Sequence, residues 1–318
     1  MSDKKMYDIV IVGGGPAGLT AAIYAARSRM DILLIESLAV MGQATMTDMI
    51  ENYPGVERST GFDLINTFKG QAKKFGMKDQ FGTVKKISAR EEKGKKVWQV
   101  EDENGTYDAL SVIVASGAKA KKIGVPGETE MLGKGVSYCA TCDGAFFKEK
   151  DIVVVGGGDT AVEEALFLTK FGRKVTLIHR RDRFRASKIL QERVFANNKI
   201  EVVWKSAVKK INGANKVNSV TIGNVDSPAQ ETEIKCDGVF VFAGWQPNTD
   251  FLKGTADLGE KGGIKVGTAM ETSAQGIFAA GDCCEKIFHQ VITACGDGAV
   301  AAFSSQSYVE RLKGTEYK

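Results

Sequence analysis

The chain has 318 residues, enough for two domains of ordinary size. Apolar residues make up 43% and charged residues 26%, which is typical of a globular protein without a long disordered tail. The 43 basic and 39 acidic side chains are nearly balanced, and no run of five or six like charges occurs. We therefore expect no nucleic-acid partner.

Residues 7–26 are nearly free of charge and are the one stretch that resembles a membrane or export segment. Their centre is Gly-Gly-Gly-Pro, which would destabilise a membrane helix, and residues 7–12 have the composition of a strand. We therefore expect no membrane segment and a cytoplasmic protein. In a reducing compartment, a C-x-x-C pair such as Cys139 and Cys142 is typical of a redox or metal site.

Residues 8–36 are repeated in residues 151–179 with a constant offset. Each copy begins with a β-branched run, turns on three glycines, continues with an Ala-rich stretch at helical spacing, and ends in a second apolar strand. Both copies are therefore predicted to be βαβ units.

The glycine spacing in each copy predicts a dinucleotide site. The first glycine permits the tight turn, the second lets a pyrophosphate approach the backbone, and the third position must be small for helix and strand to pack. The phosphate oxygens then meet the N-terminus of the following helix. These positions are Gly13, Gly15 and Gly18 in the first copy and Gly156, Gly158 and Ala161 in the second.

The end of the second strand differs between the copies. Glu36 ends the first copy, and a carboxylate there accepts hydrogen bonds from free ribose hydroxyls and repels a 2′-phosphate. The second copy ends in basic residues, and the guanidinium groups of its arginines would bind that phosphate. These are His179, Arg180, Arg181 and Arg185. The first site therefore suits FAD or NAD and the second suits NADP(H); a solvated helix start is the alternative for the basic segment.

Two dinucleotide sites with a dithiol between them in sequence indicate electron transfer between cofactors. Seven motifs then support one family: G-G-G-P-A-G at 13–18, E-N-Y-P-G at 51–55, C-A-T-C-D-G at 139–144, G-G-G-D-T-A at 156–161, H-R-R-D-R-F-R-A at 179–186, P-N-T at 247–249 and T-S-A-Q-G-I-F-A-A-G-D at 272–282. On these motifs the chain resembles the low-molecular-weight, flavin-dependent thioredoxin reductases over nearly its whole length.

The resemblance implies an α/β fold of two Rossmann-like dinucleotide-binding domains and a homodimer. An NADPH domain with the redox-active disulfide, residues 120–246, would be inserted into an FAD domain made of residues 1–119 and 247–318. The implied activity is hydride transfer from NADPH to FAD, reduction of the disulfide, and dithiol-disulfide exchange with thioredoxin. Rotation of the inserted domain would turn the cysteines alternately inward and outward.

The resemblance assigns catalytic roles to Cys139 and Cys142, and the chemistry of thiol exchange suggests a third catalytic residue, Asp143, beside them. Cys142 would face the flavin, and Cys139 would attack the substrate disulfide. Asp143 would act as acid and then base, because a leaving thiolate must be protonated and a thiol deprotonated during exchange. The alternatives are a surface turn for Asp143 and half of a zinc knuckle for the cysteines. Since no second C-x-x-C or paired histidine follows at ligand spacing, we expect no metal.

Further cofactor-binding residues also follow from the resemblance. Asp282 would bind the sugar-like chain of FAD, and His289 replaces an arginine, so that a fixed cation beside the flavin becomes titratable. Besides the first glycine turn and Glu36, the residues assigned to FAD are Gln43, Asn52, Asp282, His289, Gln290 and Val291. At the NADPH site, Asp159 and Thr160 are added.

Three further features of the sequence lead to predictions. Residues 296–298, Gly-Asp-Gly, precede a predicted helix start whose positive end would stabilise the reduced flavin. Phe146 and Phe147 either dock thioredoxin or belong to the core. The cysteines near the C-terminus are expected to be small buried hydrophobes, with a second redox pair as the alternative. They are Cys283, Cys284 and Cys295.

Other functions stay open from the sequence. A related reductase with another protein substrate and a ferredoxin-linked reductase are alternatives within the enzyme class. A non-catalytic NADPH sensor or metal-binding module is the alternative from a different class.

Overall fold

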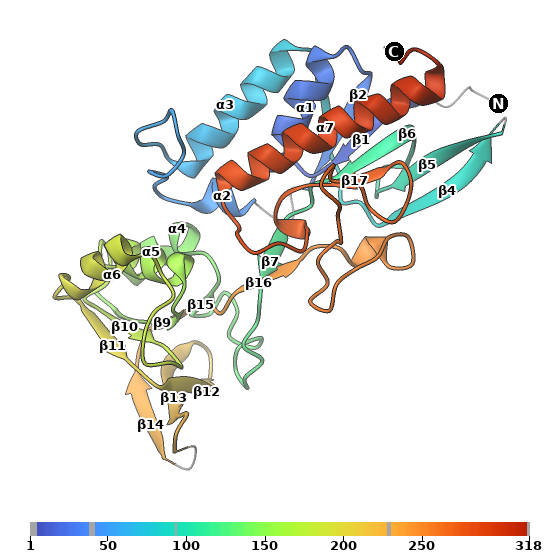
Figure 1. The fold of residues 1–318 in the computed structure, drawn as a ribbon. Coiled ribbons are helices and arrows are strands. Elements are labelled where there is room, and N and C mark those ends of the chain that lie inside the picture. Colours follow the sequence, from blue (N-terminus) through green and yellow to red (C-terminus); the bar gives the residue numbers. More distant parts are fainter. Residues whose placement is uncertain (1–4, 38–41, 93, 228–229, 317–318) are drawn as a thin grey trace. The chain divides into compact units, whose positions relative to one another are not determined.

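The computed structural model describes residues 5–37, 42–92, 94–227 and 230–316 (Figure 1). The chain forms two compact units, one made of residues 1–119 and 246–318 and the other of residues 120–245. The second unit is thus an insertion in the first. No helix in the described ranges is long and apolar enough to cross a membrane.

The first unit contains a seven-stranded sheet. Its strands are β1 (Met6–Val12), β2 (Ile32–Glu36), β3 (Lys78–Phe81), β4 (Lys86–Glu92), β5 (Lys95–Glu101), β6 (Thr106–Val114) and β17 (Ile277–Ala279). The order is β3-β2-β1-β6-β5-β4, with β17 also paired to β6. The pairs among β1, β2, β3, β6 and β17 are parallel, whereas β4, β5 and β6 form an antiparallel meander.

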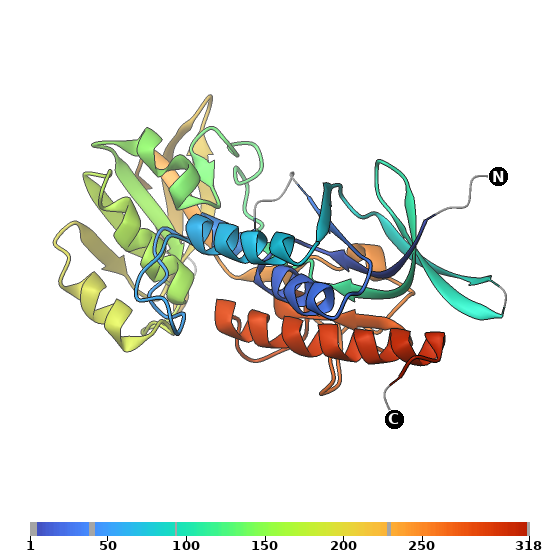
Figure 2. The same cartoon turned by 90° about the horizontal axis from the view of Figure 1, so that it is seen from above.

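Three helices lie side by side on one face of this sheet (Figures 1 and 2). They are α1 (Pro16–Arg27), α3 (Gly61–Lys74) and α7 (Val291–Lys313), and a short helix, α2 (Gln43–Met46), precedes α3. The alternation along β1 places Ile9 and Ile11 in the core beneath these helices, whereas Val10 and Val12 join the core on the opposite face. Both faces of the strand are therefore buried, as its continuous apolar run predicts.

Helix α7 begins at Val291, so the predicted helix start after residues 296–298 is wrong. Gln290 caps the helix, because its side chain accepts the N–H of Thr293 while its own N–H donates to Thr293 Oγ1 at 3.1 Å. Gly298 lies inside the helix for a packing reason. A Cβ there would lie 2.2 Å from the carbonyl oxygen of Ala17, so glycine lets α7 pack closely on α1.

The second unit is built on a five-stranded parallel sheet and a three-stranded antiparallel sheet. The parallel strands, in the order β11-β10-β9-β15-β8, are β8 (Val136–Ser137), β9 (Asp151–Gly156), β10 (Lys174–Ile178), β11 (Ile200–Val203) and β15 (Gly238–Phe242). The antiparallel strands are β12 (Ser206–Gly213), β13 (Val217–Asn224) and β14 (Glu231–Lys235). The helices are α4 (Ala140–Asp143), α5 (Asp159–Leu168), α6 (Lys188–Phe195) and the 3₁₀ helix η1 (Gly144–Phe147).

The two faces of strand β9 enter different cores of this unit. Ile152 and Val154 pack with Val162 of α5, whereas Val153 packs with Val220 of the antiparallel sheet. The predicted α/β class with Rossmann-like parallel sheets is confirmed, because each βαβ repeat has its two strands paired in parallel around a helix.

Two segments of the chain connect the units. Within each unit, these two connecting segments are hydrogen-bonded to each other. In the second unit the N–H of Lys121 donates to the carbonyl of Gly244 at 2.9 Å. In the first unit Ser116 Oγ donates to the carbonyl of Asn248 at 2.7 Å. The remaining short elements are β7 (Ala118–Ala120), β16 (Trp245–Pro247), η2 (Asp250–Leu252) and η3 (Gly281–Cys283).

Candidate redox centre and dinucleotide sites

Cys139 and Cys142 form a disulfide at the start of helix α4, with their Cα atoms 5.4 Å apart. Cys139 is the N-cap residue, and its sulfur accepts the N–H of Cys142 at 3.1 Å. The N–H of Cys139 in turn donates to Ser137 Oγ at 3.0 Å. Cys142 is exposed and Cys139 is half-buried, so the sulfur pair lies at the surface of the second unit.

The residues after the disulfide divide between surface and core. Asp143 is the last residue of α4 and is half-buried. Phe146 is 73% exposed, whereas Phe147 is 8% exposed and packs edge-on against Phe240, with ring centres 5.2 Å apart. A Cβ on Gly238 would collide with the Phe147 ring. Phe147 is therefore core, and only Phe146 is free to contact a partner.

The first glycine turn has the three features that its spacing predicts. Gly13 has φ +113°, and a Cβ there would lie 2.2 Å from the carbonyl oxygen of Ala115. A Cβ on Gly18 would lie 1.9 Å from the carbonyl oxygen of Gly13, which is the close contact of helix and strand. Gly15 is the N-cap residue of α1 and faces open space. A pyrophosphate can therefore approach the helix N-terminus at Gly15.

Glu36, at the end of β2, lies beside this turn. A Cβ on Gly14 would be 2.5 Å from the Glu36 carboxyl carbon, so a side chain there would displace the carboxylate. Lys69 of α3 contacts the same carboxylate, with its Nζ 2.9 Å from Oε2. No motif in the sequence indicates Lys69, because the pair is made by segments that only the fold brings together.

The second glycine turn repeats the arrangement. A Cβ on Gly156 would lie 2.5 Å from Cβ of Ala161, which is the helix packing position, whereas Gly158 faces open space as the N-cap of α5. Thr160 is half-buried in the first turn of α5. The carboxylate of Asp159 accepts the N–H of Ser187 at 2.7 Å, which ties the turn to the start of α6.

His179 takes the place that Glu36 has in the first unit. A Cβ on Gly157 would lie 2.2 Å from its Nδ1. The imidazole is 7% exposed and its Nε2 has no hydrogen-bond partner in the part of the chain that the structure describes. Burial lowers the pKa of His179, and the charges of Arg181 and Arg185 lower it further. At neutral pH the ring is therefore a neutral, buried group.

The basic segment after β10 is a loop and not the start of a helix, since α6 begins only at Lys188. The side chains of Arg180, Arg181 and Arg185 are exposed. The N–H of Arg185 donates to the carbonyl of Gly157 at 2.8 Å, so the loop is held beside the glycine turn. The three exposed arginines thus belong to a loop whose backbone is bonded to the second glycine turn.

Asp282, in η3, carries a buried atom without a partner. Its Oδ1 has no hydrogen-bond partner among the described residues, and burial raises the pKa of its carboxyl, against the opposing charges of His289 and Lys286. The neighbouring backbone is fixed to α7, because Asp297 accepts the N–H of Gly281 at 3.1 Å. A ligand hydroxyl would satisfy this orphaned oxygen, which fits the sugar-like chain of FAD.

Of the remaining residues assigned to the flavin, the structure brings Asn52 and Gln290 into contact, whereas Gln43 is bonded elsewhere in the first unit. Asn52 Nδ2 donates to Gln290 Oε1 at 3.1 Å, and Gln43 Nε2 donates to the carbonyl of Ala118 at 2.8 Å. His289 is exposed and Val291 is half-buried at the first position of α7. The structure thus joins Asn52 to the N-terminus of α7.

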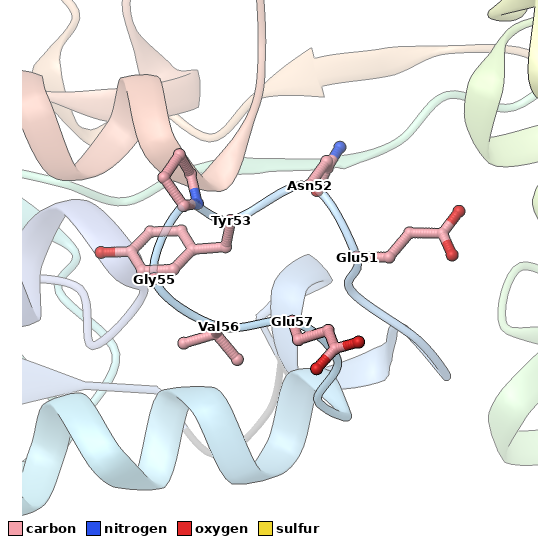
Figure 3. A pocket seen from close by; sticks show the side chains of 7 residues that line it. Glu51, Asn52, Tyr53, Gly55, Val56 and Glu57 are labelled. Carbon is pink, nitrogen blue, oxygen red and sulfur yellow. The ribbon is translucent and has the colours of Figure 1, made fainter.

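Residues 51–57 line a cavity of about 550 Å³ in the first unit (Figure 3). The figure shows that a single loop supplies its walls, and neither Gly15 nor Asp282 lines it. The loop is anchored by Asn52 to Gln290 and by the Tyr53 hydroxyl, 3.9 Å from the sulfur of Cys295. The cavity therefore lies apart from the glycine turn and shares only Asn52 with the residues assigned to FAD.

The cysteines outside the C-x-x-C pair are buried and free. The expectation that Cys283, Cys284 and Cys295 are small buried residues is confirmed, and no disulfide joins them. Among the described residues, no group of three or more His, Cys, Asp or Glu side chains is arranged to hold a metal ion.

The comparisons with known proteins agree with this geometry. The family model described as pyridine nucleotide-disulphide oxidoreductase matches residues 7–298. The chain belongs to this family. It is 48% identical to the thioredoxin reductase of Bacillus subtilis, over 99% of this chain and 98% of that protein. It is 44% identical to the thioredoxin reductase of Peptoclostridium acidaminophilum, over 96% and 98% of the two chains.

A solved structure supports the same relationship. The crystal structure of Lactococcus lactis thioredoxin reductase matches with a TM-score of 0.92 at 42% identity, covering 96% of this chain and 99% of that one. The resemblance to flavin-dependent thioredoxin reductases predicted from the sequence is therefore confirmed, and the protein is an oxidoreductase.

The orphaned carboxylate of Asp282 leads to a stability prediction for the flavin-free chain. Because the carboxyl pKa of Asp282 is raised, the folded chain favours the protonated form of this side chain. The contribution of Asp282 to stability is therefore present below its unfolded pKa and is lost as the pH rises through its folded pKa. Asp282→Asn imitates the protonated acid. We expect it to raise the Tm of the flavin-free chain at pH 7 by on the order of 2 °C.

Thermal melting between about pH 3 and pH 8 measures this effect. The two curves should converge below about pH 4, where the carboxyl is neutral in both states. The exposed Asp226 provides the control, because Asp226→Asn should leave the Tm unchanged. A flavin-free Asp282→Asn chain that melts earlier than the wild type at pH 7 would contradict the assignment.

Proposed function

We propose that this chain reduces the disulfide of thioredoxin with electrons taken from NADPH. The observation that carries the proposal is the surface disulfide Cys139–Cys142 in a chain that is 48% identical to a thioredoxin reductase over its whole length. FAD and NADPH are the cofactors. Two glycine turns that each leave open space at the helix N-terminus support the use of two dinucleotides.

We assign FAD to the first unit and NADPH to the second, inserted unit. Glu36 beside the first turn suits a free ribose, and the orphaned Asp282 suits the sugar-like chain of FAD. The guanidinium groups of Arg180, Arg181 and Arg185 suit a 2′-phosphate. Gln43, Asn52, His289, Gln290 and Val291 complete the proposed FAD site, and Asp159, Thr160 and His179 the proposed NADPH site.

The cysteines carry the exchange with the substrate. Bound FAD and NADPH supply the two electrons that convert the Cys139–Cys142 disulfide to a dithiol. The Cys139 thiolate then attacks one sulfur of the substrate disulfide, forming a mixed disulfide and releasing the other substrate sulfur as a thiolate. Cys142 next attacks Cys139, which restores the internal disulfide and releases the substrate dithiol. Asp143, one residue from Cys142, accepts and returns the proton.

We further propose a homodimer that works in the cytoplasm. Helices α1, α3 and α7 carry large exposed apolar side chains, which supports burial against a second copy. They are Tyr24, Phe62 and Phe303. A dithiol relay also requires a compartment in which thiols stay reduced.

A spectroscopic titration tests the function. The purified protein should be yellow, should lose its flavin absorbance on anaerobic addition of NADPH, and should regain it when oxidised thioredoxin is added. A colourless protein would refute the flavin assignment. Failure of thioredoxin to restore the colour, with recovery by another disulfide protein, would point to the related reductases.

The exposed ring of Phe146 should affect thioredoxin and not electron entry. Phe146→Ser is expected to raise the KM for thioredoxin by about tenfold, because an apolar contact ring at an interface contributes roughly 1 to 2 kcal/mol. NADPH oxidation by a small dye should be unchanged. The buried Phe147 gives the contrasting variant, since Phe147→Ser should cost about 3 kcal/mol of stability. Equal losses of dye and thioredoxin activity in Phe146→Ser would argue against a docking role.

A further inference from the structure

Lys69 on α3 joins two carboxylates of the first unit. Its Nζ lies 2.9 Å from Oε2 of Glu36 and 3.2 Å from Oδ2 of Asp79. The side chain is 23% exposed, and its ammonium lies 5.4 Å from the ring centre of Phe81. Burial alone would lower the pKa of Lys69, but the two carboxylates outweigh it and raise the pKa, so the cation is retained. Lys69 is thus a shielded, permanently charged partner of Glu36.

The contact between Lys69 and Glu36 affects the first dinucleotide site because of where Glu36 lies. Its carboxylate lies against the middle of the first glycine turn, where a Cβ on Gly14 would be 2.5 Å from its carboxyl carbon. At the corresponding place in the second unit the buried imidazole of His179 lies against Gly157. In the first unit, a carboxylate at this place would accept the free ribose hydroxyls and repel a 2′-phosphate. Lys69 therefore acts on the group that selects the dinucleotide.

The flexible side chain of a glutamate at a strand end must be held in place before it can act as a fixed hydrogen-bond acceptor. It has several rotatable bonds, and ordering them on ligand binding costs free energy. The ion pair with Lys69 uses Oε2, and the lone pairs of Oε1 are not engaged by that pair. A carboxylate is also a stronger acceptor for hydroxyl groups than a neutral oxygen is, because such hydrogen bonds are charge-assisted.

We propose that Lys69 is a positioning residue for the adenosine end of FAD, holding the Glu36 carboxylate ready to accept the ribose hydroxyls. The inference rests on the proposed function, since it takes FAD as the ligand of the first glycine turn. It adds a residue that touches Glu36 and not the cofactor.

The test is the FAD dissociation constant of the holoenzyme, measured from the fluorescence of flavin released on dilution. Lys69→Met should weaken FAD binding by about tenfold, the effect of losing one charge-assisted contact. Lys73→Met is the matched control, because Lys73 on the same helix contacts Asp79 at 3.3 Å but not Glu36. That control should bind FAD like the wild type.

A double-mutant cycle separates positioning from general support of the fold. If Lys69 acts through Glu36, then Lys69→Met added to Glu36→Ala should weaken FAD binding no further than Glu36→Ala alone. Wild-type affinity in Lys69→Met, or losses that add in the double variant, would overturn the inference. A wild-type protein that retains no FAD would instead refute the proposed function, and the inference with it.

Discussion

Replacing Cys142 with serine is expected to lower thioredoxin reduction by at least about 10³-fold, because serine cannot form the disulfide through which the two electrons must pass. The variant should still bind FAD and lose its yellow colour with NADPH, since Cys142 lies in α4, outside both glycine turns. Stopped-flow absorbance measures flavin reduction, and an NADPH-coupled thioredoxin assay measures turnover. The substitution should therefore block the reduction of thioredoxin and leave the reduction of the flavin by NADPH unchanged.

Cys236 offers a control thiol in the same unit. It is buried and free, and burial raises the pKa of its thiol to about 12, so it has no accessible thiolate at neutral pH. Cys236→Ala should keep turnover within about twofold of the wild type. If Cys142→Ser reduced thioredoxin at the wild-type rate, electrons would be leaving by another path and the assigned relay would not exist.

The βαβ units could be predicted from the sequence because their determinants are local. A β-branched strand, a glycine turn and an alanine-rich helix lie within 29 residues of each other, and residues 8–36 and 151–179 both contain them. A side chain at Gly18 would collide with Gly13 of the same βαβ unit, whereas one at Gly13 would collide with Ala115, which follows β6. The glycine spacing therefore predicts the helix packing of the turn but not its contact with β6.

Features that depend on contacts across the fold could not be predicted in this way. Gly298 resembles a helix breaker in sequence, yet it lies within α7 because α1 packs against it through Ala17. Phe146 and Phe147 are equivalent in composition, and only their placement against β15 separates surface from core. Lys69 meets Glu36 from a helix 33 residues later in the chain, where no pattern marks it.

The arginine loop of the second unit should determine the choice between NADPH and NADH. Arg180→Ala combined with Arg181→Ala is expected to raise the KM for NADPH on the order of 100-fold and to leave the KM for NADH within about twofold. The two nucleotides differ only in the 2′-phosphate, and each charge-assisted contact to a phosphate contributes roughly 1.5 to 3 kcal/mol. Parallel steady-state titrations with a dye acceptor measure both constants without involving thioredoxin.

Arg183 is the matched control, because it is exposed in the same loop but lies outside the three arginines assigned to the phosphate. Arg183→Ala removes one positive charge from the same loop, half of what the double variant removes, and should change the KM for NADPH by less than about twofold. A long-range effect of net charge can thus be told from direct contact. The dependence of the KM on salt concentration is a second test of direct contact with the phosphate. The wild-type KM for NADPH should rise with ionic strength, and the double variant should lose most of that dependence. Equal changes for NADPH and NADH would show that the loop supports the fold of the site and does not read the 2′-phosphate.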